Sequence, residues 1–101
     1  MLDMRELYWA AGFLEGEGSF SASGPHKQPR ISCPQVQREP LERLQKLFGG
    51  SICDGRRIST WYCGGPLAAG LMMTLWTLMS PRRRTQIESA LMPWRGKPLF
   101  R

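Results

Sequence analysis

The chain has 101 residues, a length that favours one domain over two independently stable ones. Its composition, 42% hydrophobic and 22% charged, is that of a globular protein and argues against wholesale disorder. Fourteen lysines and arginines outnumber eight acidic residues and give a net charge of +6. This balance makes a nucleic acid a candidate partner, with a functionally silent basic surface as the alternative.

No membrane span or signal peptide is expected. The longest apolar stretch, residues 66–79, is shorter than the roughly 18–20 residues that a span requires. Asp3, Arg5 and Glu6 stand where a signal peptide needs its apolar core. We therefore expect a soluble intracellular protein of the cytoplasm or nucleoid, from a cellular, phage or organelle gene, with no membrane partner and no small-molecule substrate.

The three cysteines do not predict a disulfide framework, because their number is odd and no close spacing repeats. Together with His26 they would complete a Cys3His set for zinc. The sequence contains no C-x2-C pair, however, and structural zinc sites usually use one. Cysteines that pack in a reducing compartment are therefore the favoured interpretation.

The first predicted element is a helix. Asp3 can cap it, and Glu6 stands three residues later as the capping-box partner. Residues 7–14 that follow carry no charge, so this helix should be buried on most of its sides. A second copy of the chain would explain such burial at the end of a small domain. The helix ends in an acid-Gly-acid-Gly run at residues 15–18.

Two strands follow, over residues 19–23 and 28–37, with a turn at Gly24-Pro25. Both alternate, with Phe20 and Ala22 on one face of the first strand and Ile31 and Cys33 on the inward face of the second. The polar residues of each strand should therefore point outward.

The rest of the chain repeats this order and then adds two helices. A helix begins at Pro40 and ends before Gly49-Gly50, and a hairpin over 51–53 and 57–63 turns at Asp54-Gly55. Trp61 and Cys63 are predicted as core. Helices over 67–79 and 82–92 precede a basic tail, residues 93–101. The order αββαββαα predicts one α+β domain, residues 1–101, with a four-stranded antiparallel sheet.

The spacing Gly12-x3-Gly16 leaves one ridge of the first helix without side chains. Two such helices could approach closely, as small residues permit elsewhere. Their last turns would then bring acidic residues together, and close carboxylates favour a hard cation such as Mg²⁺ between them. A buried helix with a glycine cap and a solvated acid pair is the alternative.

These residues also resemble the LAGLIDADG homing endonuclease family. Residues 10–18, AAGFLEGEG, lie over its nine-residue signature, and the following Ser-Phe is typical of it. Residues 35–52 resemble its strand-end glutamine, second helix and following strand. Residues 61–63 resemble its fourth strand, and 81–87 its basic C-terminal helix. The resemblance covers nearly the whole chain.

The resemblance implies a site-specific, divalent-metal-dependent DNA endonuclease, often encoded in introns. Only one signature is present, and single-motif members act as homodimers. It therefore implies two copies paired through their first helices on double-stranded DNA, a palindromic or nearly palindromic target, and short 3′ overhangs after cleavage. The cofactor it implies is Mg²⁺ or Mn²⁺.

The resemblance also implies roles for individual residues. Glu17 takes the position of the metal-binding acid, where most relatives have aspartate, and the Gly16 carbonyl is a second candidate ligand. Gln35 matches the polar residue that orders water, with an ordinary surface glutamine as the alternative. Arg83 falls where the family has a catalytic lysine, and arginine shifts its pKa far less readily. The expected dimer interface comprises Leu7, Ala11, Gly12, Glu15 and Gly16.

Outward positions of the sheet, together with basic residues near it, are expected to contact DNA. They are Ser21, Ser23, His26, Gln28, Arg30, Ser32, Arg56, Arg57, Thr60, Tyr62, Arg82 and Arg84. His26 has a solvated turn residue as its alternative interpretation. Two other functions stay open: a non-cleaving DNA- or RNA-binding protein on the same scaffold, such as a maturase or regulator, and a basic ribosomal or structural protein.

Overall fold

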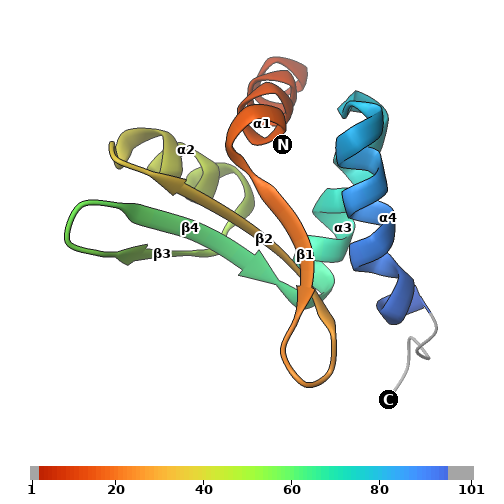
Figure 1. Cartoon of the computed structure of the whole chain (residues 1–101). Helices are drawn as coiled ribbons and strands as arrows, with labels where there is room; N and C mark the ends of the chain where they lie inside the picture. Colours follow the sequence, from red (N-terminus) through yellow and green to blue (C-terminus); the bar gives the residue numbers. More distant parts are fainter. Residues whose placement is uncertain (1–2, 96–101) are drawn as a thin grey trace.

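The computed structural model describes residues 3–95, which form four α-helices and one four-stranded antiparallel sheet (Figure 1). The elements are α1 Met4–Glu17, β1 Ser19–Ser23, β2 Gln28–Gln35, α2 Glu39–Phe48, β3 Ser51–Asp54, β4 Ser59–Gly64, α3 Gly65–Leu75, a 3-10 turn η1 Trp76–Leu78, and α4 Pro81–Arg95. The strand order is β1-β2-β4-β3. The predicted α+β class and the order αββαββαα are confirmed.

Several predicted boundaries need correction. The strand predicted to reach residue 37 ends at Gln35, and the helix predicted over 67–79 changes to a 3-10 turn at Trp76. The predicted tail began at residue 93, yet α4 continues through Pro93 to Arg95. Residues 96–101 of that tail lie outside the described residues.

Capping and alternation account for the first elements. The Asp3 carboxylate accepts hydrogen bonds from the backbone N–H groups of Arg5 (2.6 Å) and Glu6 (3.3 Å), as predicted for the start of α1. In β1 and β2, Phe20, Ile31 and Cys33 are buried. Since alternate residues of a strand point to opposite faces, the other face of the sheet faces solvent.

The four helices cover the inner face of the sheet (Figure 1). Trp61 of β4 is completely buried there, and its indole N–H donates to the carbonyl of Gly49 at 2.9 Å. Gly50 follows with φ of +87°, and a Cβ at this position would lie 2.7 Å from the Tyr62 carbonyl oxygen. The α2–β3 connection therefore packs against β4 because residue 50 has no side chain.

One face of α1 has no partner among residues 3–95. Ala10, Ala11 and Leu14 are buried, but Tyr8 is 56% exposed and Gly12 is exposed. We predicted that residues 7–14 are buried on most sides. In a single chain, only the side of α1 that faces the sheet is buried. A stripe of four exposed residues remains on the opposite side. This α1 stripe comprises Met4, Tyr8, Gly12 and Gly16.

Residue 18, between α1 and β1, packs so closely against Leu14 that only glycine fits there. A Cβ there would lie 2.9 Å from both the carbonyl oxygen and Cδ2 of Leu14, while φ of −87° suits any residue. We expect Gly18→Ala to lower the free energy of unfolding by about 1–3 kcal/mol, because a buried joint must open to admit the methyl group. Urea unfolding would measure this.

Gly70→Ala in α3 is the matched control, since a Cβ there meets no atom within 4 Å. This change should raise stability by about 0.5–1 kcal/mol through helix propensity. Equal stability of Gly18→Ala and the wild type would contradict the packing argument.

Candidate nucleic-acid interface and acidic pocket

The solvent-facing side of the sheet is polar along most of its length. Strand register pairs Ser21 with Arg30, and Ser32 with both Ser19 and Tyr62, so these side chains share one face. The outer face comprises Ser19, Ser21, Ser23, Gln28, Arg30, Ser32, Pro34, Ser51, Cys53, Thr60, Tyr62 and Gly64. It includes all seven of the strand residues predicted to contact DNA, and it presents hydroxyl, amide and guanidinium groups that suit base edges and phosphates.

Arg30 lies on this face in the inner strand β2. Its guanidinium carbon lies 4.8 Å from the centroid of the Tyr62 ring, within cation–π distance. Stacking on a neighbouring ring limits the freedom of the long side chain while leaving its donors toward solvent. Arg30 is exposed, so these donors are available to a ligand.

The two hairpin turns lie at opposite ends of the sheet (Figure 1). Gln35 pairs with Ser59, whereas Arg30 pairs with Gly64. The turn that carries exposed Arg56 and Arg57 therefore lies at the Gln35 end, and the turn that carries exposed His26 lies at the far end. The predicted DNA contacts thus extend over the whole sheet and beyond both of its ends.

An open pocket of about 480 Å³ lies at the Gln35 end. Its lining residues are Glu17, Pro34, Gln35, Val36, Gln37 and Ile58. The structure thus brings together two predicted site residues that are far apart in the sequence, Glu17 from the end of α1 and Gln35 from the end of β2. Val36 and Ile58 were not predicted, because apolar residues next to strands are ordinarily assigned to the core.

The cysteines do not form a metal site. Burial, and to a lesser extent the Glu17 carboxylate, raise the pKa of the Cys33 thiol to about 11, and burial raises that of Cys63 to about 11. Both thiols stay protonated at neutral pH, a form that binds metals poorly. Among the described residues no group of three or more His, Cys, Asp and Glu side chains is placed to hold a metal ion.

The end of α1 is held by the start of α4. The Glu15 carboxylate accepts hydrogen bonds from the backbone N–H and the hydroxyl of Ser80, both at 2.8 Å. The Nε of Arg83 donates to the Glu15 carbonyl oxygen at 2.9 Å. These three residues, which we name the α1–α4 joint, link parts of the chain that are 65 or more residues apart.

This joint bears on two predicted roles. Arg83 is only 6% exposed, and its Nη1 also donates to Gln86 at 2.8 Å. Arg83 therefore lies next to the end of α1, as expected. Its guanidinium donates to Glu15 and Gln86 of its own chain, so we assign it a positioning role instead of a catalytic one. Glu15 was expected to have a structural role rather than to bind metal, and its hydrogen bonds with Ser80 agree with that; its place at a dimer interface stays a prediction. Ala11, also expected there, is buried in its own core.

The two neighbouring arginines differ in availability. Arg84 donates to the carbonyl oxygens of Trp76 (3.0 Å) and Thr77 (2.9 Å), and its guanidinium lies 4.5 Å from the Trp76 ring. Arg84 therefore uses its donors on carbonyl oxygens of η1, and these contacts serve the fold and not the phosphate contact predicted for it. Arg82 is exposed, and its contact with phosphate stays a prediction.

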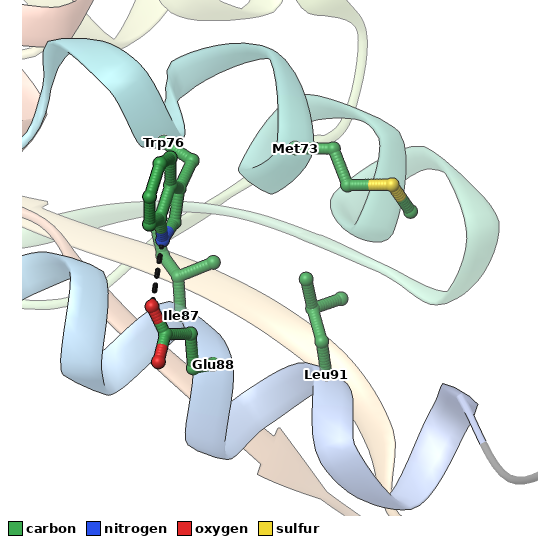
Figure 2. Close-up of a pocket in the computed structure, with 5 residues that line it drawn as sticks. All are labelled: Met73, Trp76, Ile87, Glu88 and Leu91. Carbon is green, nitrogen blue, oxygen red and sulfur yellow. Dashed lines mark hydrogen bonds between the residues drawn. The ribbon is translucent and has the colours of Figure 1, made fainter.

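A second pocket, about 460 Å³, lies between α3 and α4 and is mainly apolar (Figure 2). Met73, Trp76, Ile87, Glu88 and Leu91 line it, and Glu88 accepts a hydrogen bond from the Trp76 indole at 3.0 Å. It contains no predicted site residue. The pocket that contains Glu17 and Gln35 is therefore the candidate site.

No helix within residues 3–95 combines the length and apolarity needed to cross a membrane.

Solved structures of DNA-cutting enzymes share this fold. The homing endonuclease I-CvuI, in complex with DNA, has a TM-score of 0.69 at 16% identity, over 90% of this chain and 67% of that chain. The archaeal intron-encoded I-Vdi141I, complexed with DNA, has a TM-score of 0.72 at 20% identity, over 89% and 67%. The homing endonuclease I-TnaI has a TM-score of 0.67 at 17% identity, over 89% and 74%.

The chain thus has a LAGLIDADG-like fold, as the signature at residues 10–18 predicted. No protein-family model matches the sequence, and no curated protein matches it either.

The α1–α4 joint predicts a pH-dependent contribution to stability. The hydrogen bond from the Ser80 backbone N–H is the main cause that holds the pKa of Glu15 below its ordinary value, and the Ser80 hydroxyl and Arg83 add to it. A carboxyl whose pKa is lower in the folded state stabilises the fold above its unfolded pKa. That contribution is lost as the pH falls through the folded value.

We expect Glu15→Gln to lower the free energy of unfolding near pH 7 by about 1–2 kcal/mol, since Glu15 is partly exposed. As the pH falls through the lowered pKa of Glu15, the wild-type carboxyl becomes protonated and the difference should shrink toward zero. Urea unfolding at several pH values would test this. Glu39→Gln on exposed α2 is the control, and a difference that is independent of pH would contradict the argument.

Proposed function

We propose that the chain is a site-specific DNA endonuclease that acts as a homodimer with Mg²⁺ or Mn²⁺. The observation that carries the proposal is the pocket where Glu17 and Gln35 meet, at one end of a polar, arginine-bearing sheet face. The fold that surrounds it is that of solved homing endonucleases. Exposed Arg56 and Arg57 near the same pocket supply positive charge where a phosphate would lie.

The residues present fit a divalent cation. Glu17 is exposed in the last turn of α1, and Gly16 precedes it there, where backbone carbonyls lack intrahelical partners. A carboxylate and a carbonyl oxygen are ligands that Mg²⁺ accepts, with phosphate oxygens and water completing its shell. Each chain offers one such carboxylate at the pocket, so two copies would provide the pair.

Different residues of the chain would have different roles in phosphodiester hydrolysis. When bound, the cation would activate water and stabilise the charge on the leaving 3′ oxygen. Gln35 lines the same pocket as Glu17 and can orient the attacking water through its amide. Arg83 and Ser80 hold the end of α1 through Glu15, and so determine where Glu17 stands.

The α1 stripe supports the homodimer. Added Cβ atoms at Gly12 and Gly16 would meet no atom of the described residues within 4 Å, so no contact in that part of the chain requires glycine at these positions. Glycine in a helix costs roughly 0.5–1 kcal/mol relative to alanine. Close approach of a second α1 is the simplest reason for this cost, and it would place two Glu17 carboxylates near one two-fold axis.

Selection from a randomised duplex library tests the proposal. With Mg²⁺ we expect a palindromic or nearly palindromic sequence to be enriched among cut molecules, with short 3′ overhangs. A parallel selection in Ca²⁺ scores binding alone. Enrichment in both selections without cutting would support the non-cleaving scaffold instead, and blunt ends would contradict the dimer geometry.

Glu17→Gln should abolish cleavage of the selected duplex and leave affinity equal or higher. The change removes a metal ligand and also a negative charge that repels phosphate. Gel shift in Ca²⁺ and cleavage in Mg²⁺ separate the two effects. Glu39→Gln on α2 should change neither. Loss of binding by a folded Glu17→Gln variant would show that Glu17 has a structural role.

Gly12→Val should give a folded monomer. The side chain has space within its own chain, but it would separate two helices packed through the α1 stripe. Light scattering after size exclusion reports the mass, and circular dichroism reports the fold. Gly70→Val in α3 is the matched control, because Gly70 also has open space around it. A monomeric wild type would rule out the dimer.

Arg30→Ala and Arg82→Ala should affect DNA binding in different ways. Arg82→Ala should reduce the slope of log K against log salt by about 1 per lost phosphate contact. Arg30→Ala should relax sequence preference, because its position suits base contact. Arg84→Ala should mainly lower stability, since its donors are occupied within the chain. Unchanged salt dependence in Arg82→Ala would contradict its phosphate role.

A further inference from the structure

The outer face of the sheet changes character at the Glu17 end. Even-numbered residues of β2 and β4 point outward, and Arg30, Ser32 and Tyr62 make that face polar. Beyond the last pair, Gln35 with Ser59, the next residues are Val36 and Ile58, which continue the outward alternation. Val36 is 77% exposed and Ile58 is 49% exposed.

These two apolar side chains both line the pocket that contains Glu17. Pro34 of β2 lines the same pocket, is also exposed and outward, and pairs with Thr60. Exposed apolar side chains that gather at one place on a surface mark a contact site. They cannot read base edges through hydrogen bonds, which the rest of the face can do.

The structure holds this apolar pair firmly. Arg38, two residues after Val36, donates through Nε to the Asp54 carboxylate at 3.0 Å. The Ser59 hydroxyl donates to the same carboxylate at 2.7 Å, and the Gly55 N–H donates to the Ile58 carbonyl at 2.9 Å. The chain segments that present Val36 and Ile58 are thus tied together.

We propose that Val36 and Ile58 determine specificity for the central base pairs of the DNA target. This inference rests on the proposed function: if two copies meet at Glu17, their apolar pairs flank the centre of the bound duplex. There they would press on sugars and base edges of the central steps, as apolar side chains do elsewhere when they deform DNA. Pyrimidine–purine steps, which deform most easily, should be preferred.

The test keeps the selected half-sites constant and varies the central dinucleotide. Wild type should cleave pyrimidine–purine centres about tenfold faster than other centres. Val36→Thr keeps the β-branched shape and replaces one methyl group with a hydroxyl. It should reduce this ratio to about twofold or less with affinity in Ca²⁺ nearly unchanged. Ile58→Thr should act in the same direction and serves if Val36→Thr does not fold.

Met92→Gln, an exposed apolar residue of α4 outside this pocket, is the control and should keep the full ratio. A wild type without central preference, or threonine variants that keep it, would overturn the inference and leave the endonuclease proposal intact. If the wild type binds the duplex but does not cut it, the fluorescence of 2-aminopurine placed at the central step tests the contact instead. Fluorescence that rises with wild type and not with Val36→Thr supports the contact, and no rise overturns it. A wild type that binds no duplex overturns both proposals.

Discussion

The hydrogen bonds between Glu15, Ser80 and Arg83 are the interaction on which the candidate site depends. They hold the last turn of α1 against the first turn of α4, and Glu17 lies two residues beyond Glu15 in that turn. The joint uses both parts of Glu15, its carboxylate and its carbonyl oxygen. Because the bonds fix backbone and side chain together, α1 has little freedom to rotate and carry Glu17 away from the pocket.

The same constraint accounts for the different environments of two acidic residues in one helical turn. Glu15 faces the protein and is satisfied by donors of α4. Glu17 lies at the pocket, is exposed, and belongs to the face where a cation and phosphate can approach. Gly18 directly after it packs on Leu14 so closely that no side chain fits, which lets β1 begin at once. A structural acid and a candidate metal ligand can therefore stand two residues apart.

Arginine has two distinct uses in this molecule. Arg83 and Arg84 donate to carbonyl oxygens and side chains of their own chain, where a planar guanidinium with several donors can join separate segments. Arg30, Arg56 and Arg57 are exposed on or beside the sheet. The net charge of +6 therefore overstates the charge free to meet a nucleic acid. Position in the fold, and not residue type, separates the two groups.

The sequence by itself determined the class, the order of the elements and the polar face of the sheet. These follow from local rules: alternation placed Ile31 and Cys33 inward and Arg30 outward, and the signature at residues 10–18 predicted the fold. Only the tertiary structure decided that Arg83 is buried, that Glu15 faces α4, and that Val36 and Ile58 lie beside Glu17. Those facts depend on contacts between residues far apart in the chain, and no local pattern records which distant donor or strand end a side chain will meet.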